Sequence, residues 1–268
     1  MSRIIQPITS RIAGPFLGEQ LGGSAVVVPP SFSTTKSILF DGVDEFLSRA
    51  DSNLQDFSTT MSLSVWCKGA GIGNYGAMIQ KGENTLIVTR GYAVLDSGDS
   101  PPGKVNAQLF DATQQRRYAT SVAMLDGTWH HFVFTFSSGT LLLYIDRVLD
   151  SSATKPADQA VNSLNNTAFG LHMGCQVTGV TPATFFAGQL CNVSLWSSVL
   201  NQTAITALAT AGKPADLSLH ADFANCVSWY RLGDGDTIAA DGILDSTANA
   251  LHLSPTNMDA SNIITDAP

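Results

Sequence analysis

The stretch DGTWHHFVFTFSSGTLLLYIDRVLD, residues 126–150, decides the fold of this chain. Residues 130–136 alternate aromatic and β-branched side chains, and residues 141–148 carry apolar side chains at both odd and even positions. Both patterns favour strands, and the short polar segment with Gly139 between them predicts a tight hairpin turn. A hairpin that is apolar on both faces needs cover on both sides. We therefore expect it in the middle of a two-layer β structure.

The composition of the 268-residue chain also favours strands and turns. Glutamate occurs only at positions 19, 45 and 83, whereas glycine, serine, threonine and asparagine are abundant. Long helices need glutamate, lysine and similar residues on their outer faces. The length suits one large all-β domain or two small ones.

Charge and hydropathy limit the partners of the protein. A formal net charge of −8 and a pI near 4.9 argue against nucleic acid, because no basic stripe compensates for the negative charge. No segment reaches the roughly 18 apolar residues that a membrane span needs. Residues 1–14 lack the apolar core of a secretory signal peptide. We expect a protein that stays in the cytoplasm where it is made, or leaves it inside an assembly.

The four cysteines, Cys67, Cys175, Cys191 and Cys226, show no CxxC spacing, which argues against a zinc site. Free, buried thiols are the first expectation, because an unpaired cysteine packs like a small apolar residue. A disulfide between Cys191 and Cys226 stays open.

Residues 1–35 differ from the rest of the chain, because prolines and glycines interrupt them throughout. Such a segment cannot form a core of its own, so we predict an N-terminal arm over residues 1–35 and one domain over residues 36–268. A disordered terminus is one interpretation, and an extended arm that orders against a neighbouring subunit is the other. The apolar residues available for such a contact are Ile4, Ile5, Ile8, Ile12, Phe16 and Leu17.

Two turns are predicted in the first third of the domain. Residues 37–52 indicate a strand, a hairpin-type turn at Asp41-Gly42 and a second strand. Short strands at 77–80 and 85–89 flank a predicted turn at Lys81-Gly82.

A strand and a helix are predicted further along. Residues 61–67, MSLSVWC, alternate, so Trp66 shares a face with two serines and is either covered by a second layer or exposed for binding. The one predicted helix spans residues 202–211, with Asn201 as its N-cap and Gly212 and Pro214 as its stop.

Several of these motifs together resemble a known family. The loop D-G-T-W-H-H and the later L-Y-I-D-R-V-L are similar to the pattern D-G-x-W-H-H-V followed by L-x-L-Y-V-D-G-x-L of the laminin-G-like branch of the concanavalin A-like lectin/glucanase superfamily. Arg147 stands where this family usually has glycine. The resemblance covers residues 37–212 and implies an all-β fold, a two-sheet antiparallel jelly-roll sandwich with one short helix.

The segment VSWYRLGDGD, residues 227–236, predicts a strand that ends in an acidic, glycine-rich loop. It resembles a W-Y-R-x-G-D-G-D segment that follows laminin-G-like domains in proteins of tailed bacteriophages and related virions. This second resemblance implies a virion protein.

The sequence lacks the acid pair of a glycoside hydrolase. Retaining glucanases of this fold use two glutamates on one strand, and the chain has no E-x-D-x-x-E motif and no glutamate after Glu83. His130 and His131 are neighbours on a predicted strand, so we expect their side chains on opposite faces, where they do not share a substrate. We predict no catalytic residue and a protein that is not an enzyme.

Two kinds of binding site remain as hypotheses. Calcium needs several oxygen ligands, and the acidic candidates in predicted loops are Asp41, Asp44, Asp234 and Asp236. Calcium-binding relatives commonly use acids in the strand that here carries Cys191 and Asn192, and ordinary Asp-Gly turns are the alternative.

A glycan site needs aromatic rings on which a sugar can stack. The candidates are Trp66, Tyr75, Tyr92 and Trp229, and packing in the core is the alternative for each of them.

The leading hypothesis from the sequence is a non-enzymatic virion structural protein, a capsid decoration or a head or tail appendage. It would display a lectin-like domain and contact other virion proteins, as a homo-oligomer and by analogy of fold a trimer. One alternative is a secreted or surface carbohydrate-binding module, whose glycan binding would be lost on Trp66→Ala or Tyr92→Ala. A glycoside hydrolase that depends on an aspartate is the other.

Overall fold

The structure is a computed structural model that describes residues 32–84, 89–98, 101–111, 114–164 and 168–268. Contacts divide the chain into two units, Met1–Ser31 and Phe32–Pro268, and all the described elements belong to the second unit. The arm residues between Ile4 and Leu17 lie outside the described residues, as does most of the strand predicted at 85–89.

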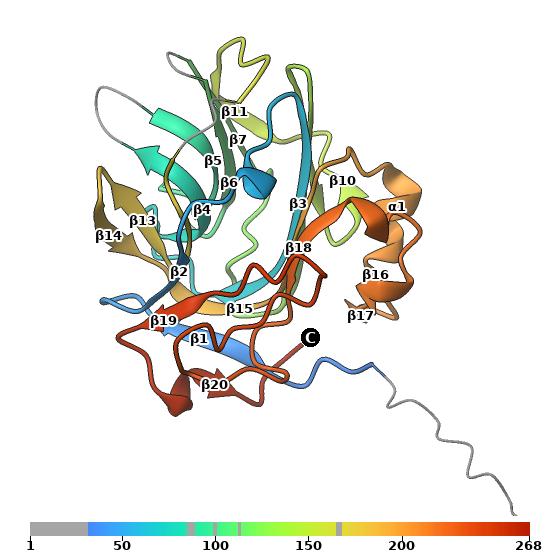
Figure 1. Ribbon diagram of the computed structural model, residues 1–268. Helices are drawn as coiled ribbons and strands as arrows, with labels where there is room; N and C mark the ends of the chain where they lie inside the picture. The colour runs from blue at the N-terminus through green and yellow to red at the C-terminus, as the bar shows by residue number, and fades with distance from the viewer. Residues whose placement is uncertain (1–31, 85–88, 99–100, 112–113, 165–167) are drawn as a thin grey trace, which may run out of the picture. The chain divides into compact units, whose positions relative to one another are not determined.

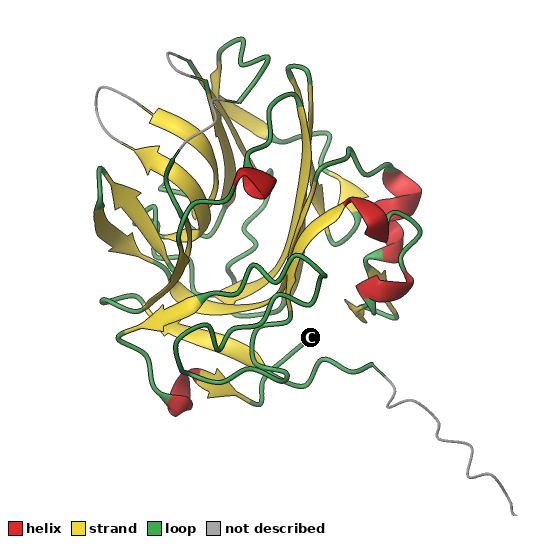
Figure 2. Cartoon of the chain, in the orientation of Figure 1, coloured by secondary structure: helices red, strands yellow, loops and turns green. Residues whose placement is uncertain are grey.

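Two antiparallel sheets form a sandwich, which confirms the predicted jelly-roll class (Figures 1 and 2). The first sheet has the strand order β10-β9-β8-β3-β15-β1-β20, and β18 pairs with β15. Its strands are β1 (Ser37–Asp41), β3 (Thr60–Gly69), β8 (His130–Ser137), β9 (Thr140–Ile145), β10 (Val148–Leu149), β15 (Ala187–Trp196), β18 (Cys226–Tyr230) and β20 (Ile263–Ile264).

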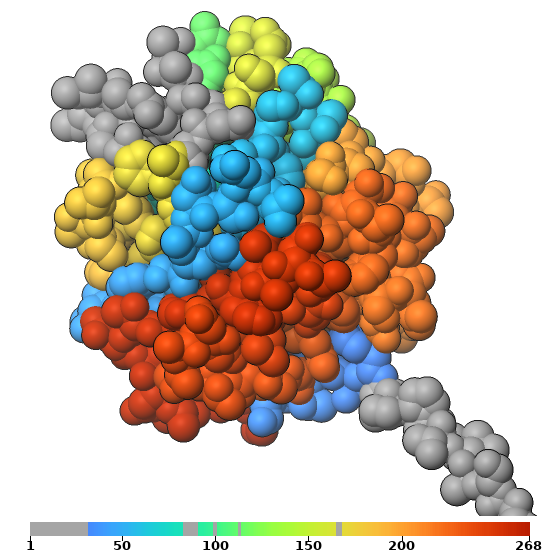
Figure 3. Space-filling model, in the orientation of Figure 1, coloured from blue at the N-terminus to red at the C-terminus, as the bar shows by residue number. Residues whose placement is uncertain are grey.

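The second sheet has the strand order β11-β7-β6-β5-β4-β12-β2-β19. Its strands are β2 (Phe46–Arg49), β4 (Ala77–Asn84), β5 (Thr89–Asp96), β6 (Val105–Phe110), β7 (Gln115–Ala119), β11 (Thr154–Asp158), β12 (Leu171–Met173) and β19 (Ser254–Thr256). Because β19 pairs with β2 and β20 pairs with β1, the C-terminal segment completes both sheets, and Figure 3 shows it in red against the blue N-terminal strands.

Smaller elements surround the sandwich. They are the hairpins β13 (Cys175–Thr178) with β14 (Thr181–Phe185) and β16 (Ala209–Thr210) with β17 (Lys213–Pro214), the helix α1 (Gln202–Ala207), and the 3-10 turns η1 (Asn53–Gln55), η2 (Leu217–Leu219), η3 (Phe223–Asn225) and η4 (Ala260–Asn262). In Figure 2 one short helical turn lies between the two groups of strands, and the other helical segments lie at their margin. Within the described part of the chain, no helix is long and apolar enough to cross a membrane.

The hydrophobic core lies between the two sheets. Leu63 on β3 and Phe134 on β8 pack in one cluster with Ile79 on β4 and Leu109 on β6, and all four side chains are fully buried. At roughly 1.5–3 kcal/mol for each large apolar side chain taken out of water, such residues supply the main driving force for folding.

The central hairpin is confirmed. β8 and β9 pair from Phe132 opposite Ile145 to Ser137 opposite Thr140. The turn residues Ser138 and Gly139 have φ values of 40° and 94°, as the tightest hairpin turns require. The hairpin is covered on both faces, because the side of β8 that faces away from the core packs under α1 and the turns that follow it.

The second strand of the hairpin ends earlier than predicted. β9 stops at Ile145, and Asp146 and Arg147, with φ values of 48° and 72°, form a second turn into β10. Arg147 therefore adopts the left-handed backbone conformation that explains the usual glycine of the resembling family.

Two turn predictions were wrong. The Asp41-Gly42 turn does not close a hairpin, because β1 pairs in the first sheet and β2 in the second. It is a corner between the sheets. Lys81-Gly82 is not a turn either, because both residues lie inside β4 and pair with β5.

The misassigned Lys81 lies on the core face of its strand with only 1% of its surface exposed. Its ammonium group lies 2.6 Å from a carboxylate oxygen of Asp51 and 2.6 Å from one of Asp56, and it donates to the carbonyl of Phe169. These partners satisfy the donors of a buried ammonium group. They come from distant segments, so the local sequence around Lys81 does not reveal them.

The predicted helix begins where expected and ends early. The Asn201 side chain accepts from the backbone N–H of Ala204, as an N-cap does. α1 stops at Ala207 because the next residues form the small hairpin of β16 and β17, with Gly212 at its turn. All four cysteines are free and buried, so the Cys191–Cys226 disulfide is not formed.

Candidate functional site

Three of the four aromatic candidates for glycan binding are buried in the core, which was the stated alternative for each of them. Trp66 is 5% exposed, Tyr92 2% and Trp229 4%, so none presents a ring face to a sugar. The Trp66 ring stacks on His131, with ring centroids 4.8 Å apart. Trp66 is therefore covered, which was one of the two alternatives that its strand pattern allowed.

Tyr75 is the exposed member of the set, with 36% of its surface open. It adopts a φ of 62° in the loop before β4, and the guanidinium carbon of Arg117 lies 6.0 Å from its ring centroid. A side chain on Gly98 would collide with this ring, so the Tyr75 loop packs directly on the β5–β6 loop. Tyr75 is therefore a single exposed ring, apart from the other three aromatic candidates, which are buried.

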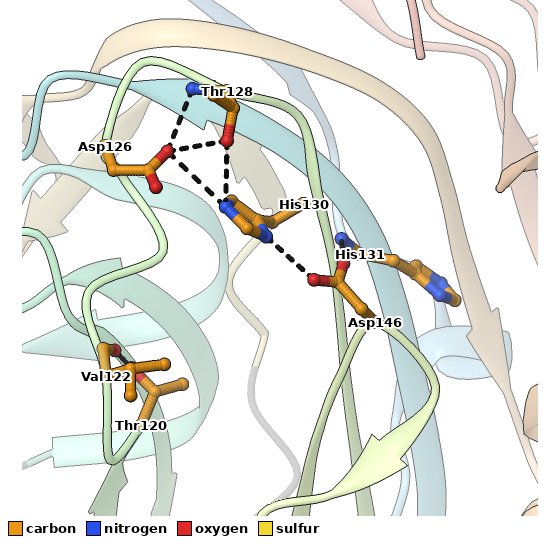
Figure 4. Close-up of polar contacts among 7 residues, drawn as sticks. All are labelled: Thr120, Val122, Asp126, Thr128, His130, His131 and Asp146. Atoms are coloured by element: carbon orange, nitrogen blue, oxygen red, sulfur yellow. Dashed lines mark hydrogen bonds and ion pairs between the residues drawn. The ribbon is translucent and has the colours of Figure 1, made fainter.

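The two histidines lie on opposite sides of β8, as predicted (Figure 4). His130 Nδ1 lies 2.8 Å from Asp146, and Nε2 lies 3.0 Å from the Thr128 hydroxyl and 3.4 Å from Asp126. Hydrogen bonds from the Thr128 hydroxyl and N–H lower the pKa of Asp126. Both ring nitrogens of His130 are thus engaged, and the network joins the loop before β8 to the turn after β9.

His131 is fully buried behind the same strand. Its Nε2 lies 2.7 Å from the hydroxyl of Ser64, and burial lowers its pKa to about 3, so its ring is neutral at physiological pH. The pair therefore serves two separate structural networks. The expectation that the two side chains do not share a substrate agrees with this geometry.

The four acidic candidates for calcium hold backbone turns or lie alone. Asp41 accepts from the N–H of Val43, and Asp236 accepts from those of Gly233 and Leu244. Burial raises the pKa of Asp236. Among the described residues, no group of three or more His, Cys, Asp and Glu side chains could hold a metal ion. Calcium binding stays a prediction, with no such group to support it.

Asp234, the fourth acidic candidate, binds the chain itself. Its carboxylate accepts from the Thr35 hydroxyl at 2.6 Å, from the Thr35 N–H at 2.9 Å and from the Lys36 N–H at 3.3 Å. These donors are the last residues of the predicted arm and the first of the domain. Three donors to one carboxylate hold the point at which residues 32–36 join the sandwich.

Neighbouring side chains hold the preceding residues. Arg231 donates to the carbonyl of Ser33 at 2.6 Å, and its guanidinium carbon lies 4.7 Å from the ring centroid of Phe32. The Phe32 ring packs on Trp229, with centroids 5.7 Å apart. Asn192 donates to the Thr34 hydroxyl and accepts from the Trp229 indole N–H. We call Asn192, Trp229, Arg231 and Asp234 the arm anchor.

The sequence pointed to the arm anchor without explaining it. Trp229, Arg231 and Asp234 all belong to the W-Y-R-L-G-D-G-D segment. The prediction placed residues 32–35 in the arm and assigned Asp234 to calcium. A contact between positions 199 residues apart, such as Thr35 with Asp234, leaves no local pattern from which it could be read.

Two clefts open beside these elements. An apolar cleft of about 790 Å³ lies between residues 32–35 and the segment from α1 to η2, with Phe32, Pro214 and Leu219 in its wall. A polar cleft of about 430 Å³ lies beside β2 and β19 and is lined by Ser48, Arg49, Ala50, Asp241, Ala250, His252 and Ser254.

A sequence profile of the concanavalin A-like lectin/glucanases superfamily matches residues 41–206, which is more than half of the chain. The chain belongs to this superfamily. The match confirms the resemblance that the motifs around His130 and His131 indicated. A search of curated proteins found no match.

Solved structures align with this chain at low sequence identity. A putative carbohydrate binding protein from Bacteroides ovatus ATCC 8483 aligns with a TM-score of 0.60 and 15% identity, over 88% of this chain and 62% of that one. A heptameric SAP-like pentraxin from Limulus polyphemus aligns with a TM-score of 0.47 and 12% identity, over 66% of this chain and 82% of that one. Domains LG4-5 of the mouse laminin alpha1 chain align with a TM-score of 0.43 and 12% identity, over 63% of this chain and 44% of that one.

The arm anchor and the polar cleft depend largely on residues beyond the profile match. Three of the four arm-anchor residues follow residue 206, as do Asp241, His252 and Ser254 of the polar cleft. The matched region therefore supplies most strands of the sandwich, and the C-terminal segment supplies its last strands, three of the four anchor residues and most of the polar cleft.

Proposed function

We propose that the protein is a non-enzymatic structural component of a virion, a capsid decoration or a head or tail appendage, that displays a carbohydrate-binding domain. The arm anchor is the observation that carries this proposal. The N-terminal residues then bind a neighbouring virion protein or a second copy, and the lectin-like sandwich faces outward to surface glycans. The anchored segment makes the connection between them firm.

Charged side chains hold the base of the arm. Asp234 and Arg231 each engage the backbone of residues 33–36, and hydrogen bonds to charged groups are stronger than those between neutral groups. Phe32 adds an aromatic contact to a buried tryptophan. A tail without a mechanical role would need no such fixation. A segment that transmits attachment to a displayed domain does.

The W-Y-R-L-G-D-G-D segment links this geometry to the virion hypothesis. Its resemblance to virion proteins and its contacts with residues 32–36 concern the same side chains, Trp229, Arg231 and Asp234. Fixing the base of an N-terminal arm is a role that explains why such a segment follows a lectin-like domain.

The non-enzymatic half of the proposal rests on the use of the polar side chains. Glu45 accepts from the N–H of Asp41 and from the amide of Asn262, so it holds the corner between the sheets. The Asp126–His130–Asp146 network ties loops together. Turnover of an oligosaccharide that is abolished by Asp126→Asn or Asp146→Asn would favour a hydrolase instead.

The test compares assembly of the full chain with that of an arm variant. Light scattering gives the mass in solution, and sedimentation gives association with virus particles. We expect a multiple of the 28.3 kDa chain and association with particles. Both are lost in the double variant Ile8→Asp/Ile12→Asp, while the exposed control Asp44→Asn keeps them. A full chain that is a monomer and does not associate with particles contradicts the virion role.

A second candidate is a secreted or surface carbohydrate-binding module without a virion role. The lectin-type sandwich shared with the Bacteroides protein supports it as well. It predicts glycan binding by the full chain, with no effect of Ile8→Asp/Ile12→Asp on its mass. A glycan array and a mass measurement with both proteins therefore separate the two candidates.

A further inference from the structure

We infer that the polar cleft beside β2 binds an acidic sugar through its carboxylate, with Arg49 as the cation that receives it. The inference rests on the carbohydrate-binding half of the proposed function and gives that function a place and a ligand class. None of the aromatic residues predicted for glycan binding lines this cleft.

Arg49 is a cation whose charge has no ion-pair partner in the described part of the chain. It is the last residue of β2, and its Nε donates to the carbonyl of Ala50 at 3.1 Å. Within the described residues, no carboxylate lies within ion-pair distance of its guanidinium group. In a chain with a net charge of −8, an arginine in a cleft wall that forms no ion pair is available for a ligand.

The one acid in the cleft wall is engaged elsewhere. Asp241 accepts from the hydroxyl of Ser254 at 3.0 Å, and its backbone N–H donates to the same hydroxyl. This reciprocal pair fixes the loop against β19. Asp241 therefore shapes the wall, while the charge of Arg49 stays free for a carboxylate.

His252 supplies a hydrogen-bond donor, and its contacts show which ring nitrogen carries the proton. The backbone N–H of Asp245 donates to its Nδ1 at 3.0 Å, so the neutral ring carries its proton on Nε2. The hydroxyl of Ser48 can both donate and accept, whereas that of Ser254 already donates its proton to Asp241 and keeps one lone pair with which to accept. The cleft thus combines one cation, one fixed donor, one hydroxyl that donates or accepts and one that only accepts.

This combination matches a uronic acid or another carboxylated monosaccharide. A planar guanidinium binds a carboxylate through two parallel N–H···O bonds, which are stronger than bonds to a neutral hydroxyl. The sugar's hydroxyls suit the serines and the histidine. A volume of about 430 Å³ lies at the small end of ligand sites and suits one sugar residue.

The experiment measures binding of glucuronate and glucose to the full chain by calorimetry or ligand-observed NMR at low salt. We expect glucuronate to bind at least about tenfold more tightly than glucose, and Arg49→Gln to remove this preference. Arg116→Gln is the matched control, because Arg116 pairs with Asp158 on the opposite edge of the second sheet, and it keeps the preference.

A second variant tests the sign of the charge without touching Arg49. Asp241 has a φ of 53°, which asparagine tolerates, and in the variant Asp241→Asn the new amide oxygen still accepts from Ser254. Removing this negative charge should leave glucuronate binding unchanged or strengthen it by a few-fold. A loss of binding in a folded Asp241→Asn protein overturns the proposal.

Further outcomes separate this inference from the function on which it rests. Glucuronate binding that survives Arg49→Gln overturns the cleft assignment and leaves glycan binding in place. Acetate or inorganic phosphate that competes as strongly as glucuronate shows a general anion site and overturns the sugar assignment. Binding to neutral glycans alone also overturns it, whereas the absence of all glycan binding defeats the carbohydrate half of the proposed function as well.

Discussion

The arm anchor and the polar cleft are both built largely from the C-terminal segment, yet they treat charge in opposite ways. In the anchor, Asp234 and Arg231 lie 3.8 Å apart and both bind the backbone of residues 33–36. In the cleft, Arg49 has no acidic partner among the described residues. A site whose polar groups are already satisfied holds its own chain. A site with an unsatisfied cation is prepared for a ligand.

The difference extends to stability. Groups satisfied within the fold contribute to its free energy of unfolding, and their removal leaves buried partners without hydrogen bonds. A side chain that waits for a ligand contributes little to stability and can be changed at small cost. Substitutions in the anchor and in the cleft test this contrast, and a buried histidine outside both gives the largest effect of a group satisfied within the fold.

The largest expected effect is the change in the free energy of unfolding with pH that the buried His131 causes. His131 has a pKa of about 3 in the folded protein because burial disfavours its charged form, against 6.5 in the unfolded chain. Below pH 6.5 the unfolded chain therefore binds a proton that the folded protein does not. The free energy of unfolding should fall as the pH drops from 6.5 to about 3, by up to roughly 5 kcal/mol.

Urea unfolding at several pH values, compared between the natural chain and His131→Gln, isolates this contribution from that of the carboxylates. The natural chain should lose more stability below pH 6.5 than the variant does. Parallel pH profiles for the two proteins would show that His131 is not buried in its neutral form.

The second prediction removes the ring at the centre of the arm anchor. Trp229 is buried, packs on Phe32 and Phe223, and donates its indole N–H to Asn192. Trp229→Ala should lower the free energy of unfolding by about 3–5 kcal/mol. Equilibrium denaturation measures this loss, and a cost below about 1 kcal/mol would mean that the anchor is not packed as described.

The third prediction removes a single charge from the anchor. Asp234→Ala leaves the N–H groups of Thr35 and Lys36 without their acceptor, so we expect a loss of about 1–3 kcal/mol and faster amide exchange at both positions. Asp44→Ala is the control, because Asp44 is exposed and makes no side-chain hydrogen bond among the described residues. Equal effects of the two substitutions would remove the argument for the anchor.

Local patterns predicted the elements that depend on neighbours in sequence. The alternation around residues 61–67 and 130–136 gave two core strands, and the polar turn with Gly139 gave the hairpin. Asn201 capped its helix as expected. In each case the pattern that identifies the element lies within a few residues, so the sequence displays it directly.

The errors share a physical cause, which is that the deciding contact lies far away in the chain. The Asp41-Gly42 turn has the composition of a hairpin, but only distant pairing partners decide that its strands enter different sheets. Lys81 resembles a turn residue until Asp51 and Asp56 are placed beside it. Arg49 and Asp241 belong to no sequence motif, and only the fold brings them to one cleft.

The smallest expected effect is the cost of Arg49→Gln to stability. The substitution removes one hydrogen bond, from Nε to the carbonyl of Ala50, and no ion pair among the described residues. We therefore expect the free energy of unfolding to change by no more than about 0.5 kcal/mol. Arg231→Gln is the matched comparison, since it loses the bond to Ser33 and the contact with Phe32, and should cost about 1–3 kcal/mol. Equilibrium denaturation of the two variants compares their free energies of unfolding. If Arg49→Gln costs as much as Arg231→Gln, then Arg49 is a structural residue, and the contrast between a satisfied anchor and a cleft prepared for a ligand does not hold.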